Sequence, residues 1–253
     1  MHSREIWQSR KAFGIVNTFH DLAIRALNRV LLLKVLMAVK IEGNDLWSDA
    51  HDGRYRFDFL DNRTVRELAT HSEYQISDDF LTEALSNSDQ CYGIFDGRVL
   101  ASYGWCSEKP TRIDPPTLRL NFSNEYAYVY KLFTHPDYRG RRLVAIGLSR
   151  ALHAYLRRGF QGLVAVVESN NFSSRKAMRR VGFQDVGKIY LGKLFGCYIV
   201  YSDQGCIQHR FELKPADPTG TGVSQTRTSP VMFANRPRGR NIYEPSTKAG
   251  GAR

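Results

Sequence analysis

The hydrophobic positions in the middle of the chain change their spacing at a clear boundary. Between residues 126 and 133 large apolar side chains alternate along the chain, which predicts a strand. Pro136 ends this strand, because proline has no N–H to donate to a neighbouring strand. From residue 143 to 156 the apolar positions recur at helical spacing, and Gly159 ends the predicted helix. A strand therefore leads through a short turn into a helix.

A second strand and a second helix continue the pattern. Residues 163–167 are apolar without interruption, which is typical of a strand buried on both faces. Residues 171–180 predict a helix that Gly182 closes. The order strand, turn, helix, strand, helix over residues 126–183 is the segment around which we expect the other elements to be arranged.

The flanking sequence predicts more strands and two further helices. One helix is expected from Thr64, with Glu67 completing a capping box, and another from Ser77 to about Ser86. Asp96-Gly97 is a strong signal for the turn of a hairpin. Strands are predicted at residues 55–60, 92–95, 99–105, 117–122, 184–190 and 196–202.

The central segment resembles the two core motifs of the GNAT superfamily of acyl-CoA-dependent N-acyltransferases. That family has a turn of the form Arg/Gln-x-x-Gly-x-Gly/Ala at a helix start, and Asn-x-x-Ala/Ser followed by Gly-Phe across the next helix. Here Arg139 opens the turn, and Asn171, Ser174 and Gly182-Phe183 match the second motif. The resemblance implies an α+β fold with a mixed, mostly antiparallel central sheet flanked by helices.

The turn can be aligned with the family in two frames. Anchored on Arg139, it has Arg142 and Val144 where the family has Gly and Gly/Ala, which is a departure from the motif. A second frame, Arg142-x-x-Ala145-x-Gly147, matches the letters but moves the turn into the helix. Small residues matter at these positions because they let a phosphate approach the main-chain N–H groups of a helix N-terminus.

The resemblance implies that the co-substrate is acetyl-CoA or another acyl-CoA, and it implies no metal. Its pantetheine arm would pair with strand backbone in a gap between two splayed strands, and its phosphates would meet the turn and its arginines. The cofactor-binding residues expected from the resemblance are Leu132, Phe133, Thr134, Arg139, Gly140, Arg141, Arg142, Leu143, Val144, Asn171 and Ser174. Val167 and Glu168 are expected across the gap.

The catalytic groups are less closely specified. Glu125 is the best carboxylate by position for a general base, although a surface charge at a strand end is an equal interpretation. The family's usual acid is a tyrosine at the position of Met178, and a thioether donates no proton. Tyr128, Tyr130, Tyr190 or solvent would then protonate the leaving thiolate, or it leaves without help.

The net charge and the cysteine positions indicate the classes of binding partner and the state of the thiols. The formal net charge of +11 favours an anionic partner, which includes a nucleotide cofactor, an acyl carrier protein, a membrane surface or nucleic acid. Nucleic acid is the least expected of these. The four cysteines, at positions 91, 106, 197 and 206, lie far apart and predict free thiols rather than a metal site or a disulfide framework. With no visible signal peptide, the expected location is the cytoplasm.

The two ends of the chain predict different additions to an acyltransferase domain at residues 54–213. Residues 1–50 are expected to be a helical extension, with a helix at residues 21–41 that packs on the domain, forms a dimer contact or lies at the inner face of a membrane. Residues 214–253 are rich in Pro, Gly, Ser, Thr and basic residues, which predicts a disordered basic tail.

Three functions stay open on the sequence. The first is transfer of an acetyl or other acyl group from acyl-CoA to an amine of a small molecule. The second is transfer of a longer acyl chain from acyl carrier protein, which the basic surface suits. The third is a non-catalytic GNAT-like binding module, which Arg142, Val144 and Met178 would allow.

Overall fold

The computed structural model describes residues 33–43, 54–113, 118–194, 197–216 and 231–233. The fold is α+β, as predicted, with a nine-stranded sheet and a three-stranded sheet. The strands are β1 Leu33–Glu42, β2 Tyr55–Phe59, β3 Gln90–Asp96, β4 Val99–Ser107, β5 Thr111–Ile113, β6 Leu118–Asn121, β7 Tyr126–Thr134, β8 Gly162–Glu168, β9 Gln184–Leu194, β10 Cys197–Ser202, β11 Glu212–Pro215 and β12 Val231–Phe233. The helices are α3 Asn62–Ala69, α4 Asp78–Ser86, α5 Leu143–Arg157, α6 Phe172–Val181 and α7 Gln204–Gln208, with 3-10 turns at Ser72–Tyr74 and Pro136–Tyr138.

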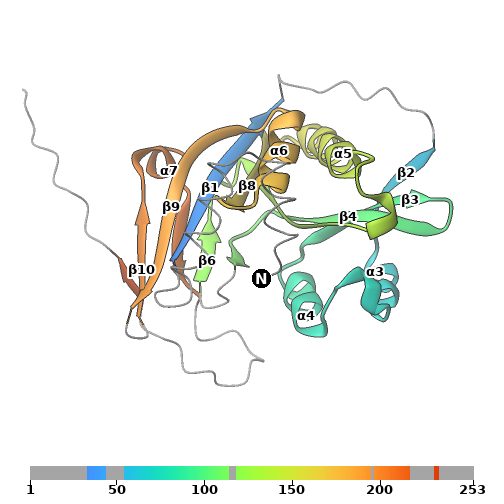
Figure 1. The fold of residues 1–253 in the computed structure, drawn as a ribbon, viewed down its shortest axis with the longest axis horizontal. Coiled ribbons are helices and arrows are strands. Elements are labelled where there is room, and N and C mark those ends of the chain that lie inside the picture. Colours follow the sequence, from blue (N-terminus) through green and yellow to red (C-terminus); the bar gives the residue numbers. More distant parts are fainter. Residues whose placement is uncertain (1–32, 44–53, 114–117, 195–196, 217–230, 234–253) are drawn as a thin grey trace, which may run out of the picture.

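The large sheet has the strand order β12-β10-β9-β1-β8-β7-β4-β3-β2. Its neighbours are antiparallel except for two pairs, β7 with β8 and β10 with β12. The parallel pair β7–β8 lies near the middle of the sheet, connected through α5 (Figure 1). The predicted order of strand, turn, helix, strand and helix is therefore confirmed.

Helices cover one face of the large sheet, and the other face is covered in two parts. On the first face, apolar side chains of α5 and α6 pack on β1, β7 and β8 in one core cluster. On the second, α3 and α4 pack on β3 and β4, while the small sheet β11-β6-β5 packs on β1, β9 and β10. A junction between α4 and the small sheet therefore lies over the middle of the second face.

The helix predicted at residues 21–41 is wrong from residue 33 onward, where the chain forms β1. This strand lies between β8 and β9 and pairs antiparallel with both. A continuous apolar run fits a buried helix and a strand buried on both faces equally well, so pairing decides between them. The rest of the predicted helix lies outside the described residues, and none of the described helices is long and apolar enough to span a membrane.

The predicted disordered tail is wrong at both of its described segments. Lys214 and Pro215 belong to β11 and pair with Arg119 and Leu118 of β6. The triplet Val231–Phe233 forms β12 and adds a parallel strand to the outer side of β10. Short segments in a polar region gain stability by pairing with the edge of a sheet, which composition averaged over the region does not indicate.

Smaller details of the predicted elements change as well. The N-cap of α3 is Asp61, whose carboxylate accepts from the Thr64 N–H at 2.7 Å, whereas Glu67 pairs with Arg63. The N-cap of α4 is Ser77, as predicted. The loop that begins at Pro110 contains β5, which the sequence did not indicate.

Candidate functional site

The two parallel strands at the centre of the large sheet separate part-way along their length. Their last pair is Tyr128 with Val164, although β7 continues to Thr134 and β8 to Glu168. On its other side β8 stays paired with β1 as far as Glu168. The separation therefore leaves about four residues of β8, or roughly 13 Å, without a neighbour on the β7 side.

A bulge in β7 stands at the beginning of this gap. Lys131 has a φ of 46°, and the register with β4 shifts between Tyr103 and Trp105. Beyond the bulge, the Phe133 carbonyl accepts from the Ser102 hydroxyl and the His135 N–H donates to Ala101, so both face β4. Because main-chain groups alternate sides along a strand, those of residues 132 and 134 face the gap. Leu132 and Thr134 thus offer main-chain groups there, and Phe133 does not.

The turn between β7 and α5 has left-handed backbone at two positions. Gly140 has a φ of 82°, and Arg142, the N-cap of α5, has a φ of 60° and makes no side-chain capping bond. Glycine adopts this conformation without the steric cost that other residues incur. Arg142 thus stands at a position whose backbone favours the Gly of the family motif.

This geometry chooses between the two frames of the turn. Because α5 begins at Leu143, the second frame would place Ala145 and Gly147 inside the helix. Gly147 has a packing role there: a Cβ built on it would come within 2.6 Å of the Tyr92 ring. The frame that begins at Arg139 is therefore the one in which the turn precedes the helix.

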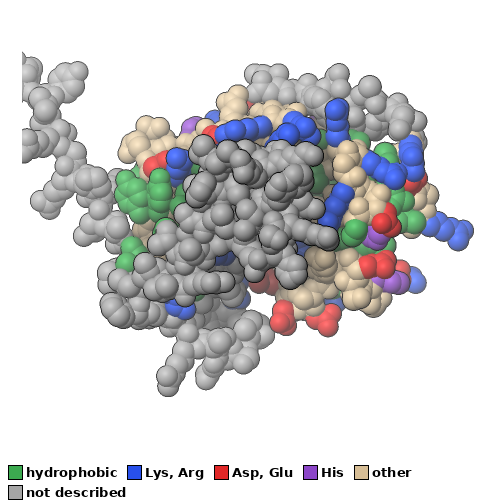
Figure 2. All heavy atoms as spheres, in the orientation of Figure 1, with side chains coloured by type: hydrophobic (Ala, Val, Ile, Leu, Met, Phe, Trp, Pro, Cys, Tyr) green, Lys and Arg blue, Asp and Glu red, His purple; other side chains and the backbone are tan. Residues whose placement is uncertain are grey.

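The arginines of the turn have different surroundings. The Arg141 guanidinium lies 4.9 Å from the centre of the Tyr138 ring and 3.5 Å from the Tyr55 hydroxyl. All three arginines, Arg139, Arg141 and Arg142, are exposed. Lys and Arg side chains also gather over α5 and α6, whereas acidic side chains lie near α4 (Figure 2). The turn thus lies on the basic side of the molecule, which suits an anion.

The second motif lies at the end of β8. Asn171 is the N-cap of α6, and its side-chain oxygen accepts from the Ser174 N–H at 3.1 Å. Capping and cofactor contact are compatible, because the cap uses only the side-chain oxygen. Met178 is 4% exposed and packs in one core cluster with α5 and with Val167 of β8, and its thioether has no proton to donate to a leaving group.

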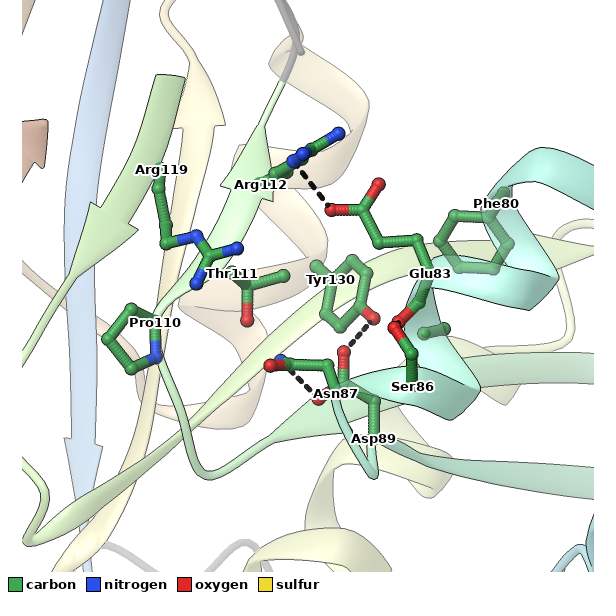
Figure 3. Close-up of a pocket in the computed structure, with 11 residues that line it drawn as sticks. Phe80, Glu83, Ser86, Asn87, Asp89, Pro110, Thr111, Arg112, Arg119 and Tyr130 are labelled. Atoms are coloured by element: carbon green, nitrogen blue, oxygen red, sulfur yellow. Dashed lines mark hydrogen bonds and ion pairs between the residues drawn. The ribbon is translucent and has the colours of Figure 1, made fainter. Parts of the chain in front are cut away.

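A cavity of about 240 Å³ lies at the junction between α4 and the small sheet (Figure 3). Tyr130 of β7 lines it, two residues beyond the last pair of β7 with β8. Tyr130 is thus the residue of the cavity wall that lies nearest along β7 to the beginning of the gap. Its lining residues are Phe80, Glu83, Ala84, Ser86, Asn87, Asp89, Pro110, Thr111, Arg112, Arg119 and Tyr130.

Asp89 and Tyr130 form the closest polar pair in the cavity wall. The Tyr130 hydroxyl donates to Asp89 Oδ2 at 2.5 Å, and Asn87 Nδ2 donates to Oδ1 at 2.8 Å. Burial raises the pKa of Asp89, although bonds from Ser107, Tyr130 and Asn87 oppose the rise. The same burial and the neighbouring carboxylate raise the pKa of Tyr130, so its hydroxyl stays protonated.

Lys131 is a further titratable group beside the cavity. Its ammonium lies 4.4 Å from the centre of the Phe80 ring, a cation–π distance. Burial lowers the pKa of Lys131. The junction therefore holds a carboxyl group and an amine whose pKa values have moved toward neutrality, a pattern that is common at functional sites.

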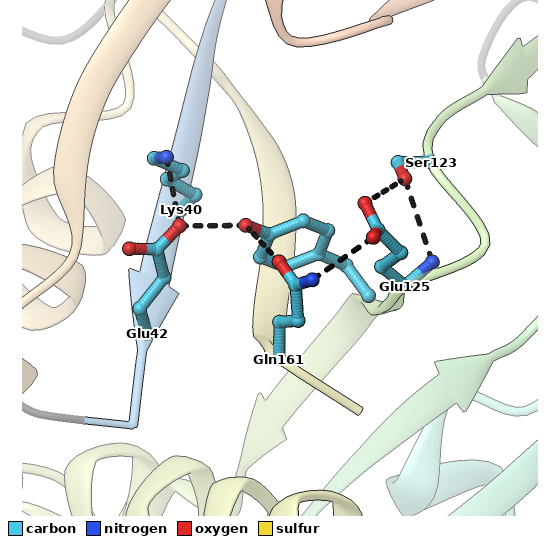
Figure 4. A network of polar contacts seen from close by, with 6 residues as sticks. Lys40, Glu42, Ser123, Glu125 and Gln161 are labelled. Atoms are coloured by element: carbon cyan, nitrogen blue, oxygen red, sulfur yellow. Dashed lines mark hydrogen bonds and ion pairs between the residues drawn. The ribbon is translucent and has the colours of Figure 1, made fainter. Parts of the chain in front are cut away.

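Glu125 lies at the other end of β7, where the strands are still paired (Figure 4). Its carboxylate accepts from the Ser123 hydroxyl at 3.0 Å and from the Gln161 amide at 2.9 Å. Along the strand it is about 16 Å from Tyr130. Its position therefore does not bring it to the gap, and it argues against the predicted role as general base.

The two predicted catalytic tyrosines occupy different places. Tyr128 belongs to the last pair of β7 with β8, and its ring stacks on Tyr130 at 5.4 Å, but it is buried among core side chains of the small sheet. Burial raises the pKa of Tyr128. Tyr190 lies on β9, three strand spacings or about 14 Å from β7, where its ring meets Tyr201. The structure thus brings Tyr128 to the gap and leaves Tyr190 away from it.

The family model for the acetyltransferase (GNAT) family matches residues 54–183, just over half of the chain. The chain belongs to the GNAT acetyltransferase family. The matched residues run from the beginning of the β2 region to the end of the second motif. The GNAT match does not include β1, which lies in the middle of the sheet although it precedes the matched residues.

Several solved structures resemble this GNAT chain at low identity. A GNAT acetyltransferase from Colwellia psychrerythraea is 17% identical with a TM-score of 0.46, covering 68% of this chain and 60% of its own. A GCN5-related N-acetyltransferase from Kribbella flavida is 13% identical with a TM-score of 0.46, covering 68% and 63%. A Drosophila protein is 14% identical with a TM-score of 0.46, covering 72% and 58%.

The chain spans about 60% of the length of these three structures. No curated protein matches the sequence. The family model, rather than these likenesses, decides that the chain is a GNAT protein.

Most residues of the cavity carry no recognisable signal in the sequence. Asp89, Glu83, Arg112 and Arg119 belong to no motif, and Tyr130 was only one of several alternatives for the acid. One signal was present: Asp89 stands directly before an apolar strand, where a carboxyl group is buried if the strand is central. Nothing in the local sequence indicated which residue would face it.

Proposed function

We propose that this protein transfers an acyl group from acyl-CoA, in the simplest case acetyl-CoA, directly to an amine in the gap between β7 and β8. The observation that carries the proposal is the end of pairing at Tyr128 and Val164, next to the Gly140 turn. The open strand edges accept an extended pantetheine arm, and the first turn of α5 presents main-chain N–H groups to its phosphates. The family membership supports this arrangement.

The main chain of β7 orients the thioester. Main-chain groups of Leu132 and Thr134 face the gap and would pair with the amides of the arm. An N–H aimed at the thioester oxygen stabilises the negative charge that develops there. Arg139 and Arg142 are exposed beside the turn and would meet the phosphates.

The chemistry is one substitution at the carbonyl carbon. The amine nitrogen bonds to that carbon, the carbon–sulfur bond breaks, and an ammonium acceptor loses two protons in total. One proton goes to the thiolate of CoA and one is released to a base. In this proposal the amine approaches from the cavity, since Tyr130 lines the cavity and lies two residues beyond the last pair of β7 with β8.

Tyr130 and Asp89 are the residues that we assign to proton movement. The Tyr130 oxygen can accept from the acceptor amine while its hydroxyl donates to Asp89, so a proton can pass to the carboxylate. Protonated again, the same hydroxyl is a donor for the thiolate. This assignment replaces Glu125 and Tyr190. Tyr128 supports the ring of Tyr130 by stacking against it and has no role in proton transfer in this proposal.

Binding and turnover test the proposal on the full chain. We expect CoA and acetyl-CoA to raise the melting temperature, because a ligand of the folded state stabilises it. We expect a panel of amines to release free thiol from acetyl-CoA. Acyl carrier protein loaded with a long chain is the second donor to test. No melting shift with any of these donors would overturn the proposal and favour a non-catalytic module. The cytoplasmic location expected from the sequence stays a prediction.

A further inference from the structure

Two arginines face each other across the small sheet beside the proposed acceptor cavity. Arg112 of β5 and Arg119 of β6 are directly paired, and both line the cavity. Like charges opposite each other on neighbouring strands destabilise a sheet unless an anion lies between them. The arrangement therefore raises the question of which anion compensates them.

The described carboxylates form a direct ion pair with only one of the two arginines, although the charge of Arg119 also acts on Glu83. Glu83 Oε1 lies 3.2 Å from Arg112 Nε in an ion pair. Arg119 forms no ion pair with a carboxylate of the described residues, and the Nε atoms of both arginines are buried without a hydrogen-bond partner. An unmatched buried donor on a cation costs free energy that a bound anion would recover. Two guanidinium groups of the cavity thus share one carboxylate among the described residues, and Arg119 is the one without a direct ion pair.

The arginines and the reacting groups lie on different sides of the cavity. Arg112 and Arg119 come from the small sheet, Asp89 lies on the opposite wall, and Tyr130 stands between them (Figure 3). The second carboxylate, Glu83, points to Arg112 and leaves Asp89 with Tyr130 and Asn87. A molecule with its amine at Tyr130 would therefore place its other end near Arg119.

We infer that the acceptor carries a carboxylate as well as its amine, in the manner of an amino acid, and that Arg119 binds the carboxylate. This inference rests on the proposed function. The carboxylate would take the fork of Arg119, a geometry in which two parallel N–H bonds form. The amine would then lie against the Tyr130 oxygen, next to the thioester.

The size of the cavity agrees with a small acceptor. Its volume of about 240 Å³ is below the range of roughly 300–1,000 Å³ that is usual for drug-sized ligands. A single amino acid fits this limit better than an amino sugar built from several rings. The acceptor class is thus narrowed by charge and by volume independently.

Matched acceptors test the carboxylate directly. We would measure thiol release from acetyl-CoA with the common L-amino acids, β-alanine and 4-aminobutyrate, each beside its primary amide. At least one acid should exceed its amide in kcat/KM by about 10- to 100-fold, the value of a charge-assisted bond to an arginine. The amide is the more reactive control, because its amine is less basic and less protonated. Equal or better turnover of the amides would overturn the inference.

Variants at Arg119 test the assignment to that residue. Arg119→Gln should raise KM for the preferred acid by about 10- to 100-fold, leave kcat within a few fold, and remove the preference over the amide. Arg119→Lys should restore part of the preference, since it keeps the charge and loses the fork. Arg66→Gln removes the same charge from an exposed position on α3 and should change neither constant. An unchanged preference in Arg119→Gln would contradict the assignment.

The melting temperature separates this inference from the proposed function. If CoA raises the melting temperature but no acid reacts or adds a further shift in its presence, the inference fails and the proposed function stands. If neither CoA nor acetyl-CoA raises the melting temperature, the proposed function fails, and the inference fails with it.

Discussion

The two ends of the β7–β8 pair carry similar residues in different surroundings. At the closed end, Tyr126 donates to Glu42 at 2.6 Å and contacts Gln161, which in turn bonds to Glu125 (Figure 4). At the open end, Tyr130 donates to Asp89 at 2.5 Å. Each end thus has a tyrosine hydroxyl on a carboxylate.

The carboxylates of the two pairs differ in burial and in the direction of their pKa shift. Glu42 lies near the surface, and bonds from Lys40 and Tyr126 lower its pKa. Asp89 is 7% exposed, and burial raises its pKa. At the closed end, the ionised form of Glu42 is stabilised, and this carboxylate links β1 to β7. At the open end, burial destabilises the ionised form of Asp89. Similar residues serve structure at one end and suit proton transfer at the other.

The largest effect should come from the open end. Asp89→Asn should lower kcat about 100-fold or more, because it removes the proton acceptor behind Tyr130. The melting shift with CoA should be unchanged, since Asp89 contacts no part of the expected CoA path. Lys131→Met serves as the comparison in steady-state kinetics. If Lys131→Met abolishes turnover and Asp89→Asn does not, the base is the lysine.

The same variant should change how stability depends on pH. Because the folded pKa of Asp89 is raised, the folded state holds this proton at a pH where the unfolded chain has lost it. The free energy of unfolding should therefore fall as the pH rises from about 4 through the folded pKa. The charges of Glu83 and Lys109 interact with the charge of Asp89, and both residues are unchanged in this variant. Urea unfolding of Asp89→Asn over that range should show a smaller decrease, because the raised pKa of Glu83 still contributes, and an identical pH profile would contradict the assignment.

The next effect tests the turn that precedes α5. Gly140→Val should weaken CoA binding about tenfold or more, because a β-branched residue cannot hold a φ of 82° and the turn must change shape. Gly159→Val is the matched control: its φ is 89°, it has the same open space around Cβ, and it follows the other end of α5. Calorimetric titration should show weaker CoA binding in the first variant alone. Equal losses would mean that strain, rather than the turn, was measured.

A smaller change in the opposite direction is expected at the N-cap of α5. Arg142→Gly should stabilise the fold by about 1 kcal/mol, since glycine has no steric penalty in left-handed backbone. Urea unfolding measures this gain. CoA affinity should change only a few fold, because the freer approach to the N–H groups offsets the lost charge. A loss of stability would show that the Arg142 side chain has a contact worth more than the strain.

The smallest effect is expected at the closed end. Glu125→Gln should leave kcat and its pH profile unchanged and lower stability by no more than about 1 kcal/mol, because one of two surface hydrogen bonds is weakened. Steady-state rates over a pH series measure this directly. A clear loss of turnover would restore Glu125 as the base and reverse the comparison between the two ends.

Structural features that depend on neighbouring residues could be predicted from the sequence. Alternating apolar positions specify β7, helical spacing specifies α5, and Gly140 marks a left-handed turn between them. These signals lie within a few residues of the structure that they produce. They were sufficient for the family, the central order of elements and the position of the turn.

The tertiary structure alone decided which distant residues meet. The apolar run of β1 has the same composition as a buried helix, and only pairing with β8 and β9 made it a central strand. Tyr130 meets Asp89 across 41 positions of sequence, and Arg119 faces Arg112 because two short strands pair. Burial and pairing depend on the whole fold, so the raised pKa of Asp89 and the position of Arg119 opposite Arg112 have no local signal in the sequence.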